Sequence, residues 1–124
     1  MAQIIVVDDE PDITEMLDTM LRLRGWTVKR ASNRREALQM VREDPEIHMI
    51  LLDYNMPGMR AEDFIEQIRH LNPNPKIVLL TAAHKVEDRA KQLDLDYYLA
   101  KPFEADDIYK KIAECIQCHG VSTN

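Results

Sequence analysis

The sequence is poor in the residues that mark several protein classes. Its 124 residues include only 3 glycines and 2 cysteines. Cys115 and Cys118 lie near the end of the chain. When a cytosolic protein has only two cysteines, they are usually reduced thiols. The few glycines are scattered, at positions 25, 58 and 120. Such scattered glycines cannot build a loop that cradles a nucleotide phosphate.

Long apolar runs and an excess of positive charge are also missing. No stretch approaches the roughly 20 uncharged residues that span a bilayer, and the first residues do not resemble a signal peptide. We therefore expect a cytoplasmic protein with no membrane partner. The 22 acidic and 16 basic residues give a net charge of -6. This balance opposes binding to phosphate backbones, so we expect no direct contact with nucleic acid.

The composition and length of the chain are typical of one globular domain. Hydrophobic residues make up 45% of the chain, which is too high for disorder. A chain of this length can bury roughly two-thirds of its unfolded surface without disulfide or metal support. We predict one domain over residues 1–119, followed by a disordered tail over 120–124.

Apolar runs rich in β-branched residues alternate with segments of helical period, a pattern typical of an α/β fold with a parallel sheet. The first, third and fourth runs are continuously apolar, as in strands covered on both faces, whereas the second and fifth are weaker and suit sheet edges. The five predicted strands cover residues 4–7, 27–30, 47–52, 77–80 and 98–100.

Five helices are predicted between and after these strands. Gly25 is placed to end the first helix in a left-handed conformation, and Asn33 can cap the second. The third stops before Pro73. The fourth, over residues 86–93, carries the fewest apolar positions, and the fifth starts near Glu104.

Chemical groups gather where the predicted strands end. The first strand is followed by Asp8 and Asp9, the third by Asp53, the fourth by Thr81 and the fifth by Lys101. The carboxyl ends of parallel strands share one sheet edge, so these groups should converge. Three neighbouring carboxylates repel one another unless a cation offsets them. Oxygen ligands without histidine or cysteine favour Mg²⁺.

Each of these residues also has a simpler interpretation. Asp8, Asp9 or Asp12 could cap the helix that follows the first strand. Asp53 could be a turn residue, and Lys101 a solvated surface charge. The predicted position of all these residues at one edge of the sheet favours a functional site.

Four motifs strengthen this interpretation: VDDE at 7–10, LDYNMPGM at 52–59, LTA at 80–82 and YLAKPF at 98–103. In their order and spacing, they make nearly the whole chain resemble a response regulator receiver domain. The resemblance implies a flavodoxin-like α/β fold, a doubly wound sheet of five parallel strands in the order 2-1-3-4-5 with five helices.

The resemblance also implies a phosphoryl-transfer site. Asp53 would take a phosphoryl group from a histidine kinase or histidine phosphotransfer protein. Mg²⁺ would be held by Asp9, Asp53 and the backbone carbonyl of Asn55, with Asp8 acting mainly through water. The chain would then be a signalling module that catalyses only its own phosphorylation and dephosphorylation.

Further residues take their expected roles from the same resemblance. Lys101, the Thr81 hydroxyl and the Ala82 backbone N–H would bind phosphoryl oxygens. Thr81 and Tyr98 would form the switch that changes the surface of the fourth helix, fifth strand and fifth helix. That surface would bind a downstream protein or a second phosphorylated copy. The Lys101–Pro102 bond is expected to be cis. Tyr98 could instead be a half-buried aromatic residue with no switching role.

The sequence departs from the family pattern at a few positions. Family members often carry Gly-Ala where this chain has Asp94-Leu95, and glycine in place of Ala61. Ala83 cannot orient an attacking water, which predicts a slowly hydrolysed phosphoryl group.

Two alternatives to a stand-alone signalling module are compatible with parts of the sequence. The chain could be a receiver domain cut from a longer regulator with an output domain. It could also be a small phosphotransferase of the haloacid dehalogenase type, which also uses a nucleophilic aspartate. That class places an acidic residue where this chain has Asn55.

Overall fold

The computed structural model describes residues 3–82 and 84–118, with side chains up to residue 115. Strands and helices alternate throughout, as the sequence predicts. The predicted tail over 120–124 lies outside the described residues. In chain order the elements are β1 (Gln3–Val7), α1 (Pro11–Leu23), β2 (Thr27–Ala31), α2 (Arg34–Glu43), β3 (Ile47–Asp53), α3 (Ala61–Leu71), β4 (Lys76–Ala82), α4 (Val86–Gln92), β5 (Tyr97–Lys101) and α5 (Ala105–Cys118).

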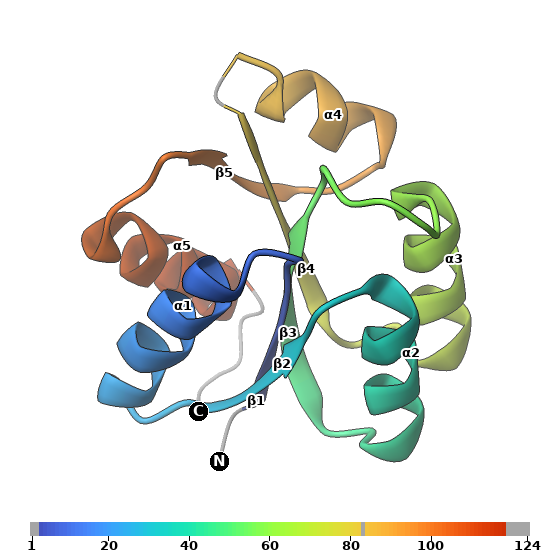
Figure 1. The fold of residues 1–124 in the computed structure, drawn as a ribbon, viewed down its shortest axis with the longest axis horizontal. Coiled ribbons are helices and arrows are strands. Elements are labelled where there is room, and N and C mark those ends of the chain that lie inside the picture. Colours follow the sequence, from blue (N-terminus) through green and yellow to red (C-terminus); the bar gives the residue numbers. More distant parts are fainter. Residues whose placement is uncertain (1–2, 83, 119–124) are drawn as a thin grey trace.

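The five strands form one parallel sheet in the order β2-β1-β3-β4-β5. This confirms the predicted flavodoxin-like fold and the edge positions of the second and fifth strands. Helices cover both faces of the sheet: α1 and α5 lie on one side, and α2 and α3 on the other (Figure 1). β2 lies on one side of β1, and the later strands β3, β4 and β5 follow on the other side. Folds of this kind open a crevice between β1 and β3, at the carboxyl ends of the strands.

Alternation along the strands divides the core into two layers. Met49 and Leu51 of β3 pack in the cluster with α1 and α5, whereas Ile50 and Leu52 pack with α2 and α3. Burying each such side chain contributes about 1.5–3 kcal/mol. Asp53 continues the alternation of Met49 and Leu51. A carboxylate therefore stands at the end of the central strand, on the side of α1 and α5.

The ends of the helices follow their predicted signals. Asn33 Oδ1 accepts the Glu36 N–H at 2.8 Å and caps α2. Gly25 has a φ of 89° just after α1, which confirms the predicted left-handed ending. No helix among residues 3–82 and 84–118 is long and apolar enough to cross a membrane.

Four strands run further than predicted, to Ala31, Asp53, Ala82 and Lys101. Pairing continues to these ends, because Asp53 is in register with Leu80 and Ala82 with Lys101. Asp53, Thr81 and Lys101, which the sequence placed after the strands, thus belong to the strands themselves, whereas Asp8 and Asp9 follow β1 as predicted. The sheet hydrogen bonds fix their positions.

Asp94 stands where members of the resembled family often have glycine, and its backbone adopts the conformation that this position requires. Asp94 has a φ of 57°, the left-handed conformation that glycine adopts easily and aspartate tolerates. Arg69 Nη2 donates to the Asp94 carbonyl at 3.0 Å. The loop before β5 therefore keeps a glycine-like turn without glycine, at a cost in strain.

Among the side chains that the structure describes, α4 buries fewer residues than any other helix, as predicted. Only Val86 and Ala90 are buried in α4, whereas α1, α2 and α3 each bury four residues. Fewer buried contacts make α4 easier to displace than the other helices.

Candidate functional site

Three carboxylates meet at the carboxyl edge of β1 and β3. Asp8, Asp9 and Asp53 each offer an oxygen within 4.8 Å of the others. The meeting follows from the register, because Val7 pairs with Leu52 and the next residue of each segment is an aspartate. The carboxylates differ in burial: Asp8 and Asp53 are 1% and 2% exposed, whereas Asp9 is exposed.

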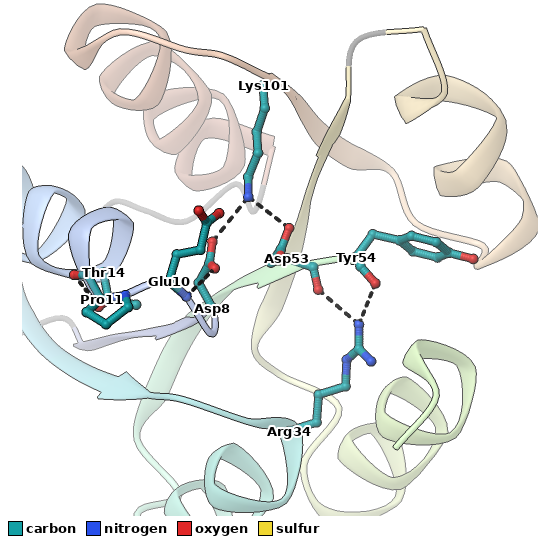
Figure 2. A network of polar contacts seen from close by, with 8 residues as sticks. All are labelled: Asp8, Glu10, Pro11, Thr14, Arg34, Asp53, Tyr54 and Lys101. Carbon is teal, nitrogen blue, oxygen red and sulfur yellow. Dashed lines mark hydrogen bonds and ion pairs between the residues drawn. The ribbon is translucent and has the colours of Figure 1, made fainter. Parts of the chain in front are cut away.

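Lys101 joins the two buried carboxylates. Its Nζ donates to Asp53 Oδ1 at 2.9 Å and to Asp8 Oδ2 at 3.2 Å. Figure 2 shows the lysine side chain reaching from β5 to a point between the two aspartates. The Lys101–Pro102 peptide bond is cis, which confirms that prediction.

The charges in this site are not balanced. Burial raises the pKa of Asp53, and the neighbouring Asp8 charge adds to this effect, while the hydrogen bond from Lys101 opposes it. Burial alone would lower the pKa of Lys101, but its attraction to Asp53 and Asp8 prevails and the pKa is raised. Three ionised carboxylates and one ammonium leave two negative charges. The site therefore favours an additional cation.

The capping interpretation explains only part of the acidic cluster. The residue at the N-cap of α1 is Glu10, whose side chain makes no capping hydrogen bond, and Asp12 lies in the first turn. Asp8 Oδ1 accepts the Glu10 N–H at 3.0 Å, while Asp8 Oδ2 faces Lys101. Asp8 thus fixes the turn into α1 and also belongs to the charged site.

The other predicted residues surround this cluster. Thr81 is buried at the end of β4, and Ala82 beside it pairs with Lys101. Asn55 is exposed in the loop that follows β3. The predicted role of Ala83 lies outside the described residues.

Tyr98 lies on β5, away from the carboxylates. Leu79 pairs with Tyr98 and Thr81 with Ala100, so Thr81 and Tyr98 share one face of the sheet. The Tyr98 hydroxyl donates to Glu87 Oε2 of α4 at 3.3 Å.

Sequence reasoning missed Arg34. This residue is only 3% exposed, and its guanidinium donates to the backbone carbonyl of Asp53 and to carbonyls of the loop between β3 and α3. A signal for it was present, since the buried stripe of α2 consists of Arg34, Ala37, Leu38 and Val41. That spacing places an arginine among the core positions of an amphipathic helix.

Tyr54, the residue after Asp53, connects the same loop to α4. The Arg89 guanidinium lies 4.6 Å from the centre of the Tyr54 ring, and Arg89 Nη1 donates to the Tyr54 hydroxyl at 3.1 Å. One aromatic side chain thus links the acidic site to the least buried helix.

The acidic cluster and its bridging lysine lie at the carboxyl edge of a sheet with the strand order 2-1-3-4-5. Comparisons with known proteins identify the family that has this arrangement. The family model of the response regulator receiver domain matches residues 4–113. The chain belongs to this family. A homolog of the transcriptional regulatory protein CpxR from Haemophilus influenzae is 35% identical over 114 residues, 90% of this chain and 49% of that protein. The chain spans about half the length of the curated relatives that it matches.

Solved receiver structures agree with this membership. A response regulator receiver domain protein from Clostridium thermocellum is 27% identical, with a TM-score of 0.85, and the match covers 97% of this chain and 98% of that one. The response regulator TrrA of Thermotoga maritima is 33% identical, with a TM-score of 0.80, covering 93% and 99% of the two chains; it was solved in complex with Mg²⁺-BeF.

Proposed function

We propose that this receiver domain accepts a phosphoryl group on Asp53 and uses it to change its surface. The observation that carries the proposal is the bridge from Lys101 to the buried carboxylates of Asp8 and Asp53. A buried carboxylate beside a fixed ammonium, with a second acidic residue exposed nearby, suits phosphoryl transfer. In this reaction the protein supplies positioning and charge rather than covalent chemistry.

The donor is a phosphohistidine of a histidine kinase or histidine phosphotransfer protein. An Asp53 oxygen attacks phosphorus, the phosphorus–nitrogen bond of the donor breaks with its electron pair passing to the imidazole nitrogen, and that nitrogen takes up a proton from solvent. Lys101 stays hydrogen-bonded to the site and neutralises charge on the phosphoryl oxygens. The Thr81 hydroxyl and the Ala82 N–H donate to the remaining oxygen.

The donor atoms of the site suit Mg²⁺. Three carboxylates within 4.8 Å of one another provide hard oxygen ligands and an excess of negative charge. Asp9, Asp53 and the Asn55 backbone carbonyl would hold the ion, with Asp8 contributing through water. When bound, Mg²⁺ would neutralise charge on the phosphoryl group and the acidic residues. The TrrA complex with Mg²⁺-BeF supports Mg²⁺ as the ion.

The output follows from residues around the site. Thr81 moves toward the new phosphoryl group, and Tyr98, on the same face of the sheet, turns into the space that Thr81 leaves. This movement breaks the Tyr98–Glu87 hydrogen bond and releases a constraint on α4. The rearranged surface of α4, β5 and α5 then binds a downstream protein or a second phosphorylated copy. Beyond its own phosphorylation and dephosphorylation, the domain catalyses no reaction.

The test is phosphorylation by acetyl phosphate with Mg²⁺, read on a phosphate-affinity gel. Asp53→Asn keeps the volume of the side chain and removes the nucleophile, so the shifted band should disappear. Asp63→Asn, at an exposed position of α3, is the matched control and should keep the band. An undiminished band in Asp53→Asn would reject Asp53 as the acceptor.

A further inference from the structure

The backbone of the acidic site is held from below by a buried arginine on α2. Arg34 Nη2 donates to the carbonyls of Asp53 at 3.0 Å and Tyr54 at 2.8 Å, and Nη1 donates to those of Met59 at 2.5 Å and Met56 at 3.4 Å. Figure 2 shows Arg34 and Lys101 approaching Asp53 from opposite sides, one at the main chain and one at the carboxylate.

The contacts of Arg34 bracket Asn55. Two of them fix the carbonyls on either side, those of Tyr54 and Met56. The Met56 N–H also donates to the Tyr54 carbonyl at 3.2 Å, which closes a three-residue turn centred on Asn55. The same Tyr54 oxygen therefore receives one bond from the turn and one from Arg34. With both neighbouring peptide groups held, the direction of the Asn55 carbonyl is fixed.

Stability alone is a weak reason for this arrangement. Burial lowers the pKa of Arg34 below its usual value, although the nearby Asp53 charge acts in the opposite direction. The buried Arg34 Nε has no hydrogen-bond partner in the described part of the chain. A buried, incompletely paired guanidinium costs free energy, and an apolar residue on the α2 stripe would avoid that cost.

We infer that Arg34 is a positioning residue for the metal site, because its planar fork holds the turn that aims the Asn55 carbonyl. The inference rests on the proposed function, since it concerns the ion that assists phosphorylation of Asp53. Arg34 touches neither the phosphoryl group nor the ion; it acts through the backbone. Groups that orient a metal ligand typically change metal affinity 10–100-fold when they are lost.

The charge and the shape of Arg34 have opposite effects on Mg²⁺, so they can be separated. The positive charge repels the ion, whereas the hydrogen bonds orient its ligand. Arg34→Lys keeps the charge but loses the planar fork that reaches several carbonyls. Mg²⁺ titration by calorimetry should therefore show binding weakened by about tenfold or more in Arg34→Lys. Arg35→Lys, at the neighbouring exposed position, should match the wild type.

A second measurement does not depend on the metal. In metal-free protein, Arg34→Lys should shift the NMR amide signals of residues 54–56, 58 and 59, and Arg35→Lys should leave them in place. Arg34→Gln, which loses both charge and fork, should also shift these signals. Urea unfolding of each variant identifies any that is not folded, and the milder lysine variant then carries the comparison.

The outcomes separate this inference from the proposed function. If Arg34 served stability only, Arg34→Lys would unfold at lower urea but bind Mg²⁺ within twofold of the wild type. If it acted by charge only, Arg34→Lys would bind like the wild type and Arg34→Gln would bind more tightly. Either result overturns the inference while leaving Asp53 phosphorylation intact. A wild-type protein that neither binds Mg²⁺ nor becomes phosphorylated overturns both.

Discussion

Replacing Lys101 with methionine should make the metal-free domain clearly less stable and its stability strongly dependent on Mg²⁺. Methionine keeps most of the length and the apolar stem but removes the ammonium that lies 2.9 Å from Asp53 and 3.2 Å from Asp8. The variant therefore leaves two buried carboxylates and the exposed Asp9 with no lysine to offset them.

The size of the loss follows from these distances. At an effective dielectric constant of about 20, each of the two charge pairs contributes roughly 5 kcal/mol of attraction before desolvation is subtracted. Measured losses for removing one partner of a buried pair are about 3–5 kcal/mol. The Lys101 side chain is 23% exposed, so we expect the lower end, about 3 kcal/mol. A domain of this length has about 6–19 kcal/mol of stability, and the variant should still fold.

Urea unfolding with and without Mg²⁺ measures this effect. A loss of about 3 kcal/mol corresponds to a midpoint lower by about 1–2 M urea. Mg²⁺ should restore more stability in Lys101→Met than in the wild type, because the variant site carries one more net negative charge. Lowering the pH should also narrow the stability gap between the variant and the wild type, because burial raises the pKa of Asp53 and its protonation removes a charge that Lys101 offsets.

The control is Lys111→Met, whose side chain has the same 23% exposure but pairs with the exposed Glu114. Surface pairs of this kind contribute about 1 kcal/mol or less, so the control should unfold close to the wild type. Equal midpoints for the two lysine variants, or an equal response of Lys101→Met and wild type to Mg²⁺, would refute the electrostatic account.

Three more outcomes are expected. The pKa of Asp53 is raised above 3.8, so any stability that Asp53→Asn gains over the wild type in metal-free buffer should shrink as the pH falls from neutral toward that value; a gap independent of pH would contradict this. Asp94→Gly should raise the free energy of unfolding by about 0.5–1 kcal/mol by relieving the left-handed conformation, whereas Asp96→Gly should lower it. Ala83→Glu should accelerate loss of radiolabelled phosphoryl by orienting water, and an unchanged decay would argue that loop exposure sets the rate.

The sheet and much of the acidic site could be predicted because their signals are local and repeated. Continuous apolar runs identify the central strands, and an aspartate directly after such a run lies at a known edge of the sheet. Asp8 and Asp53 needed only the strand order to be brought together. The strand ends were predicted too short because pairing, which the sequence does not display, continues into polar residues such as Asp53 and Lys101.

Arg34 was harder to find because its environment comes from distant residues. The carbonyls that it binds lie 19–25 residues further along the chain, and carbonyls carry no side-chain signature. An arginine in the first turn of a helix usually points to solvent. Asp94 posed a similar problem, since its left-handed conformation shows only in the backbone. The sequence pattern therefore did not indicate which backbone carbonyls Arg34 binds or which residue takes a left-handed conformation.

The contact between Lys101 and Asp8 joins residues 93 positions apart, and this separation bears on how the chain folds. In any partly folded state in which β1 and β3 have paired and β5 has not, Asp8 and Asp53 lie together without Lys101. Such a state carries two carboxylates that no lysine offsets. Docking of β5 supplies the missing ammonium. The attraction of Lys101 to Asp8 and Asp53 therefore stabilises the packing of the edge strand β5 against the sheet as well as the charged site.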